Sequence, residues 1–323
     1  MTGTIAAALA ALPDKRHEDW RYTDLAPLKA RAWVEQPSQT ETIELHGTQP
    51  ITRTLALGGA AEGAMRVVHR IALRPHQEAV LVLHETAVDV PGLVMHDIEI
   101  SLAGNASLIL YRLQQPGAAT NVISRLDARL ARDARFTCIG LYAGGALVRN
   151  DLNVALDAPG AQAELHGVLL PGAGEHLDVH TRLDHRAPHG RSREMFRCLV
   201  PAKARAVFNG KVIVQAGAQK TDSEQHVDSL LLGPGAEVDA KPELEIYADD
   251  VKCAHGATCG QLDDAAIYYL RTRGLDLASA RSLLLYTFAH EIVGRIAHEP
   301  ARQLAEHALR ARLPGAGALR ELP

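Results

Sequence analysis

The chain has 323 residues and a formal net charge of −4, with 22 % charged and only 4 % aromatic side chains. This mild acidity gives no basic surface of the kind that binds nucleic acid or an anionic membrane, so small molecules or other proteins are the expected partners. No apolar stretch approaches the ~18 residues that suggest a membrane span.

The N-terminal residues are apolar as far as Pro13, and the positive charges of Lys15 and Arg16 follow that run. A secretory signal has its charges before the apolar run, so we expect a cytoplasmic protein. Four cysteines are too few for a disulfide framework in so long a chain. Two of them, Cys138 and Cys198, lie in strand-like runs and are expected to be buried in the core.

The first 40 residues predict a short helical segment that leads into a strand-rich region. Within it, His17–Leu28 carries Trp20 and Tyr22 among polar residues. The simplest interpretation is an anchor in which both aromatic side chains pack on the core of the protein.

Short runs of alternating apolar and polar residues recur through the middle of the chain and predict strands. The runs are Ala79–Leu83, Asp97–Leu102, Ser107–Leu113, Phe136–Leu141, Leu152–Leu156, Leu177–Leu183 and Val212–Val214. Corners with small residues separate many of them. Each corner holds an alanine, and the alanines Ala106, Ala134, Ala161, Ala204 and Ala236 are 28, 27, 43 and 32 residues apart.

A loose repeat of this size, without a helical pattern, fits a parallel β-helix in which each coil stacks on the one before. An antiparallel sandwich is the alternative, but Asn209-Gly210 is the only hairpin-type dipeptide in the sequence. We therefore predict a mainly β protein with a parallel β-helix over residues 41–261.

Residues 262–323 change to a helical pattern and predict a C-terminal helical subdomain. Asp263 and Asp276 can each cap a helix, and Gly274 can end the first of these in the left-handed conformation. A third helix has Pro300 in its first turn and ends at Pro314-Gly315.

The second of these helices is predicted over Leu277–Ile296. Apolar residues recur every four positions and have further apolar neighbours, so more of its circumference is apolar than a small subdomain needs to bury. The recurring positions are Leu284, Phe288, Ile292 and Ile296.

The segment Cys253-Ala-His255-Gly-Ala-Thr-Cys259-Gly brings two thiols and an imidazole together just before the helices. Sulfur and imidazole ligands suit iron, zinc or an iron–sulfur species. In an extended segment Cys253 and His255 face the same side and could meet one metal, with Cys259 as a further ligand. A closed zinc site needs four ligands, and a packed histidine between buried thiols is the alternative interpretation.

Other motifs do not carry chemistry. His290-Glu291 begins like a zinc-protease helix, but Gly294 stands where the second histidine is required, so both side chains are expected at the helix surface or an interface. No phosphate-binding loop motif is present, so any ATP chemistry must come from another chain. The histidines of His176–His189 alternate with acids and arginines and predict a solvated strand face.

The run Ala248–Gly274, which contains the Cys-x-His-Gly motif, resembles the C-terminal signature of the SufB/SufD family of iron–sulfur cluster assembly scaffolds. His17–Leu28 is similar to a second motif of that family. Leu270 stands where SufB-like chains have a cysteine, so the resemblance favours the SufD branch. It covers the chain from about Arg16 to Ile296.

The resemblance implies a right-handed parallel β-helix with helical ends, and a scaffold without enzymatic activity. It implies pairing with a SufB-like sister subunit through the β-helix ends, and binding of the ABC-type ATPase SufC through the C-terminal helices. We place the SufC contact at Leu284, Phe288 and Ile292.

The resemblance also assigns His255, with Cys253, to cluster assembly at the SufB interface, while Cys259 inherits no role. The isolated chain is expected to hold no stable cofactor, and iron or a nascent cluster would be present only transiently. A homodimer of the isolated chain stays open. The alternatives are a free-standing zinc-binding β-solenoid and a β-helix carbohydrate-active enzyme.

Overall fold

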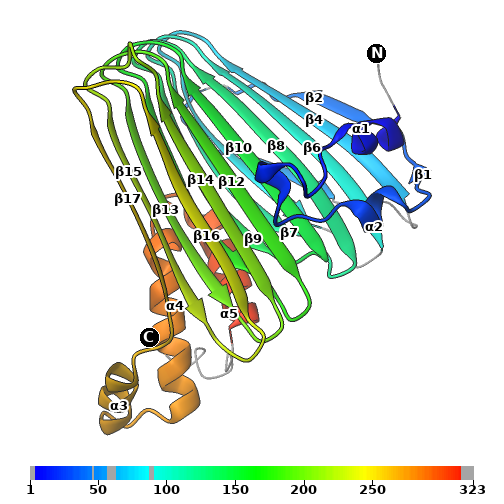
Figure 1. The fold of residues 1–323 in the computed structure, drawn as a ribbon, viewed down its shortest axis with the longest axis vertical. Helices are drawn as coiled ribbons and strands as arrows, with labels where there is room; N and C mark the ends of the chain where they lie inside the picture. Colours follow the sequence, from blue (N-terminus) through cyan, green and yellow to red (C-terminus); the bar gives the residue numbers. More distant parts are fainter. Residues whose placement is uncertain (1–3, 46, 57–62, 87–90, 314–323) are drawn as a thin grey trace.

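The computed structural model describes residues 4–45, 47–56, 63–86 and 91–313, which form a parallel β-solenoid of about seven coils with helices at both chain ends (Figure 1). The helices are α1 (Ile5–Ala11), the 3-10 helix η1 (Glu18–Trp20), α2 (Ala26–Lys29), α3 (Asp264–Thr272), α4 (Leu277–Val293) and α5 (Glu299–Arg312). The strands are β1 (Val34–Glu35), β2 (Gln39–Thr42), β3 (Ile51–Ala56), β4 (Gly63–Leu73), β5 (Glu78–Thr86), β6 (Gly92–Leu102), β7 (Ser107–Gln115), β8 (Thr120–Leu130), β9 (Arg135–Ala143), β10 (Leu147–Leu156), β11 (Gln162–Leu170), β12 (His176–His185), β13 (Arg191–Val200), β14 (Arg205–Val214), β15 (Asp222–Leu231), β16 (Glu237–Ile246) and β17 (Lys252–Gly260).

Successive strands alternate between two parallel sheets, so that each coil contributes one strand to each. Sheet A contains β1, β2 and the even-numbered strands from β4 to β16, and sheet B contains the odd-numbered strands from β3 to β17. All pairings are parallel among the described residues. The predicted parallel solenoid is therefore confirmed, and the antiparallel sandwich is excluded.

The corner alanines explain the uneven repeat. Ala106, Ala134 and Ala161 are fully buried, one coil apart, at the corner that precedes sheet B. The carbonyls of Ala106 and Ala134 accept hydrogen bonds from the first residue of the strand in the next coil. Ala204 and Ala236 occupy the opposite corner, which precedes sheet A. The wide gap after Ala161 arises because the pattern moves from one corner to the other.

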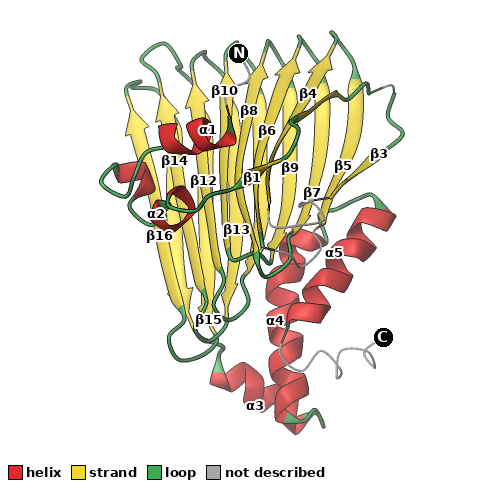
Figure 2. Cartoon of the chain, turned by 90° about the vertical axis from the view of Figure 1, so that its right-hand side faces the viewer, coloured by secondary structure: helices red, strands yellow, loops and turns green. Residues whose placement is uncertain are grey.

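Three apolar clusters hold the molecule together. The largest fills the solenoid between the two sheets, and it includes the fully buried Cys138 and Cys198, as predicted. A second joins the outer face of sheet B to α4 and α5, and a third joins the outer face of sheet A to α1, η1 and α2. The two helical regions thus cover opposite faces of the solenoid (Figure 2).

The C-terminal helices begin where the sequence predicted. The side chains of Asp263 and Asp276 accept hydrogen bonds from the first turns of α3 and α4, and Gly274 has a φ of 98°. Helix α4 ends at Val293, three residues before the predicted Ile296. Pro300 lies in the first turn of α5, whereas Pro314-Gly315 lies outside the described residues. Among the described helices, none is long and apolar enough to cross a bilayer.

Candidate functional site

The predicted ligand segment forms β17, the last strand of sheet B. Only β15 pairs with β17 in the described structure, so the other edge of the strand is open. Cys253 and His255 lie in register with Ser223 and Gln225, both of which are buried inside the solenoid. Cys253 and His255 therefore face inward at an uncapped end, where Cys253 is half-buried and His255 is exposed.

The two side chains share one face of the strand, as the alternation of an extended segment predicts. Burial raises the pKa of the Cys253 thiol above its ordinary value. A raised pKa keeps the free thiol protonated, so a thiolate at this position has to be stabilised by a cation such as a metal ion. Their role as ligands stays a prediction.

Cys259 is on the same face as His255 but four residues further along. Strand β17 remains extended through both residues, and at ~3.3 Å per residue the two positions lie roughly 13 Å apart. In this conformation the structure does not bring Cys259 to the metal position that Cys253 and His255 could share. Within the described residues, no group of three or more His, Cys, Asp or Glu side chains could hold a metal ion.

Polar side chains line the interior of the two coils below this end, and the sequence analysis missed them. The Ser192 hydroxyl donates to Ser223 across 2.8 Å, and Ser223 is in register with Cys253. A parallel row leads from Glu194 through Gln225 to His255. The signal was available, because these residues occupy inward positions of β13 and β15, where alternation predicts apolar side chains.

Burial affects the acid–base behaviour of this row. The carboxyl group of Glu194 is 2 % exposed, and burial raises its pKa to about 7. One coil deeper, the inward neighbours in register with Ser192 and Glu194 are Ala163 and Leu165. In these two rows the polar side chains therefore begin at β13 and continue to the open end.

The N-terminal segment is an anchor, as predicted for Trp20, whereas Tyr22 is only half-buried. Trp20 is 7 % exposed and packs on sheet A, and the Thr23 hydroxyl is hydrogen-bonded to Asp178 of β12. The prediction of a solvated strand face at His176–His189 is wrong. Asp178 is fully buried beneath this anchor, and His185 points inward and is hydrogen-bonded to Ser192.

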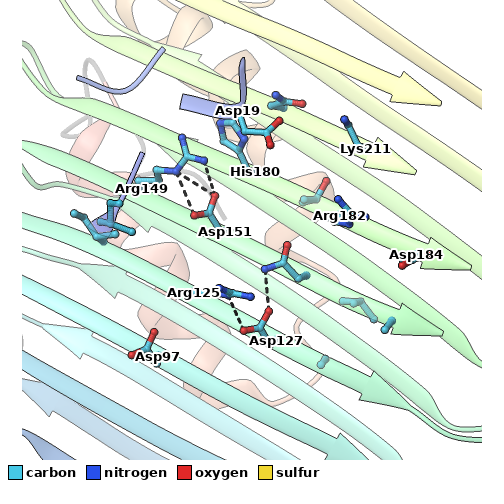
Figure 3. Close-up of a pocket in the computed structure, with 18 of the residues that line it drawn as sticks. Asp19, Asp97, Arg125, Asp127, Arg149, Asp151, His180, Arg182, Asp184 and Lys211 are labelled. Carbon is cyan, nitrogen blue, oxygen red and sulfur yellow. Dashed lines mark hydrogen bonds and ion pairs between the residues drawn. The ribbon is translucent and has the colours of Figure 1, made fainter. Parts of the chain in front are cut away.

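A groove of about 890 Å³ lies on the outer face of sheet A beside the anchor (Figure 3). Its acidic residues would be the candidates for a carbohydrate-active enzyme, which requires two cooperating carboxyl groups. Four of its five aspartates are instead paired with an arginine at 2.7 or 2.8 Å, and the fifth, Asp19, lies 3.9 Å from His17. The pairs are Asp97 with Arg66, Asp127 with Arg125, Asp151 with Arg149, and Asp184 with Arg186. A carboxylate held in an ion pair is not free to cooperate with a second carboxyl group in this way.

Helix α4 lies against the outer face of sheet B, and this corrects one predicted contact. Ile292 is fully buried in the cluster between α4 and sheet B, so it is not available to a partner. Phe288 is half-buried beneath the guanidinium group of Arg197, and Leu284 is half-buried. Glu291 is an interface group, since it pairs with Arg197 at 2.6 Å.

Aromatic side chains are exposed on α3. Tyr268 is 70 % and Tyr269 is 57 % exposed, and Leu277 at the start of α4 is 45 % exposed. Large apolar side chains grouped in this way are typical of a protein contact surface.

Comparison with known proteins identifies the relatives of this fold. The family model described as the SufBD core domain of the SUF system for FeS cluster assembly matches residues 57–288. The iron-sulfur cluster assembly protein SufD of Escherichia coli is 34 % identical over 263 residues, which cover 81 % of this chain and 62 % of that protein. An iron-sulfur cluster assembly SufBD family protein of Synechocystis is 34 % identical over 61 % of this chain and 44 % of its own length. The chain thus spans less than two thirds of these relatives.

Proposed function

The chain belongs to the SufBD family of the SUF iron–sulfur cluster assembly system, and on this basis we propose that it is a SufD-type scaffold without enzymatic activity. The observation that carries the proposal is the position of Cys253 and His255. They share the inward face of the last strand, at an open end of the solenoid. A partner that docks there would cover both side chains.

The end of the solenoid is suited to a second β-solenoid. Strands β16 and β17 are the terminal strands of their sheets, and each presents an edge that is unpaired within the described structure. An exposed edge strand has unpaired backbone N–H and C=O groups that can pair with another chain. Docking of a similar solenoid would provide hydrogen-bond partners for these groups. The proposed partner is a SufB-like sister subunit, and a homodimer would use the same edges when that subunit is missing.

The proposed second partner is the SufC ATPase, bound by the C-terminal helices. Tyr268, Tyr269 and Leu277 are exposed there, and Leu284 and Phe288 of α4 are half-buried. Ile292 is no longer part of this proposal because it belongs to the contact of α4 with sheet B.

Iron or a nascent cluster is the cargo of this site. Cys253 and His255 supply two ligands, whereas a cluster is generally held by four. The remaining ligands would come from the facing subunit, so the chain alone would hold no stable metal or cluster. His255 supplies a neutral nitrogen ligand and Cys253 a thiolate once the metal lowers its pKa.

The test is complementation of a strain that depends on its SUF system. We expect His255→Ala to leave folding and binding of both partners intact and to lower the activity of iron–sulfur enzymes in the cells. His226→Ala, which removes a half-buried histidine from the neighbouring β15, is the matched control. Normal maturation with His255→Ala would show that the proposed role of His255 is wrong.

A second experiment tests the shared site. The chain is purified without oxygen and treated with iron and sulfide, first alone and then with its SufB-like partner. We expect a stable cluster only when the partner is present. A cluster that forms on the chain alone and is lost with Cys253→Ser would instead show a complete site in one subunit.

A further inference from the structure

A buried row of three residues in register leads from the interior of the solenoid to His255. Glu194 of β13 is aligned with Gln225 of β15, and Gln225 is aligned with His255 of β17. Neighbouring strands of a sheet lie only ~4.8 Å apart, so side chains in this row are stacked neighbours. Glu194 and Gln225 are 2 % and 0 % exposed, whereas His255 is exposed at the open end.

The amide group of Gln225 has a fixed orientation. Its Nε2 donates a hydrogen bond to Oε2 of Glu194 at 2.5 Å, so the amide nitrogen is engaged by the residue one coil deeper. The amide oxygen Oε1 is buried and has no hydrogen-bond partner among the described residues. An unsatisfied buried acceptor is costly, which indicates that a donor is provided in another state of the protein.

Gly210 makes room for this arrangement from the opposite sheet. A Cβ atom at Gly210 would lie 2.2 Å from Nε2 of Gln225, a distance that no real packing tolerates. Gly210 belongs to the Asn209-Gly210 pair that resembled a hairpin signal in the sequence. In the structure the pair lies within β14, and the missing side chain leaves space for the Gln225 amide.

We propose that Gln225, oriented by Glu194, is a positioning residue for His255. Its amide oxygen accepts a hydrogen bond from the N–H of one ring nitrogen of His255, and the other ring nitrogen stays free to bind iron. The inference rests on the proposed function, since it assumes that His255 is a ligand. A ligating histidine nearly always donates its second ring N–H to a carbonyl or carboxylate group, which fixes the tautomer and the ring orientation. Gln225 is the aligned neighbour of His255 that offers a buried carbonyl oxygen without a donor.

The first measurement is the tautomer of His255 in the full chain, read from the ring nitrogen shifts of histidine labelled with nitrogen-15 and assigned with His255→Ala. We expect one dominant tautomer in the wild type. Gln225→Met replaces the amide with an apolar group of similar length, and the tautomer mixture of a free imidazole should appear. Gly210→Ala should have the same effect by displacing the amide, which gives a second variant if the first folds poorly.

The control is Gln114→Met. Gln114 is also an inward, fully buried glutamine, hydrogen-bonded to Asn150 in the middle of the solenoid and far along the chain from β17. Gln114→Met should lower stability without changing the His255 signals. Both variants remove a buried amide, so a change in the His255 signals that occurs only with Gln225→Met cannot be a general effect of that loss.

The second measurement is the rate of cluster formation with the SufB-like partner present. Loss of a residue that orients a metal ligand typically costs 10–100-fold, so Gln225→Met should slow cluster formation about tenfold or more, and Gln114→Met should not. Unchanged ring signals and rate with Gln225→Met, while His255→Ala abolishes assembly, would overturn this inference and leave the proposed function standing. Normal assembly with His255→Ala would overturn the proposed function and the iron-binding part of this inference with it.

Discussion

The guanidinium carbon of Arg149 lies 3.7 Å from the centre of the Trp20 ring, and this contact fixes the N-terminal segment to sheet A. Arg149 is itself 1 % exposed and pairs with Asp151 at 2.8 Å and Asp178 at 3.2 Å. A cation stacked on an indole in a desolvated site contributes about 2 kcal/mol beyond the packing of the ring. Trp20 is therefore a principal contact between the anchor and sheet A.

We predict that Trp20→Ala lowers the free energy of unfolding by about 3 kcal/mol or more, because it removes a large buried ring and uncovers the Arg149 cluster. Denaturant unfolding measures the change, and hydrogen exchange should show faster exchange in β10 and β12. Trp33→Ala, at a half-buried position, is the control and should cost less. Equal losses for the two variants would contradict the assigned anchor.

The second prediction concerns a buried ion cluster inside the solenoid. Glu85 accepts two hydrogen bonds from Arg112, at 2.9 and 3.0 Å, and is paired with His96 at 2.5 Å, and all three residues are fully buried. Burial alone would raise the pKa of Glu85. The charge of Arg112 and the hydrogen bond with His96 outweigh burial and hold the pKa at about 2.

Because the folded pKa of Glu85 lies below its unfolded value of about 4.3, its stabilising effect is complete above that pH and is lost as the pH falls towards 2. We expect Glu85→Gln to abolish this part of the acid dependence. At neutral pH it should cost about 3–5 kcal/mol, since Arg112 is left buried without its partner. Glu78→Gln, at the exposed start of the same strand, should change neither the acid dependence nor the stability at neutral pH.

Glu194 should show the opposite pH dependence. Burial raises its pKa to about 7, so the folded protein keeps a proton that the unfolded chain loses near pH 4.3. The wild type should therefore lose stability relative to Glu194→Gln as the pH rises from about 4.3 to 7, by up to about 3 kcal/mol. Unfolding curves of both proteins between pH 4 and 8 measure this difference. A constant difference over that range would show that folding does not raise the pKa of Glu194.

The strands and helix caps could be predicted from local patterns, because alternation and capping depend on neighbours in the sequence. The strand runs, the Asp263 and Asp276 caps and the Trp20 anchor all appear in the structure. The geometry of the coil could not be predicted in this way. The alanines at both corners of the solenoid have the same sequence pattern. The sequence therefore does not show that Ala161 and Ala204 occupy different corners.

The site was predicted in part, and the omissions share a cause. The pairing of Cys253 and His255 on one face follows from spacing alone. Glu194 and Gln225 could not be connected to them, because alignment across coils depends on the register of strands far apart in sequence. Ile292 was misplaced for a related reason. Helix periodicity identifies apolar positions, but it does not show which of them face sheet B.

The last prediction separates the contact of α4 with sheet B from the proposed contact of α4 with SufC. Leu284→Asp places a charge at a half-buried position, where it should weaken binding of the SufC ATPase while the chain stays folded. Ile292→Asp places the same charge in the fully buried contact with sheet B and should destabilise the protein by about 4 kcal/mol or more. Thr287→Asp, on the exposed face of α4, is the control. Thermal unfolding and co-purification with SufC measure the two effects separately. Retention of SufC by a folded Leu284→Asp variant would exclude this part of α4 from the ATPase contact.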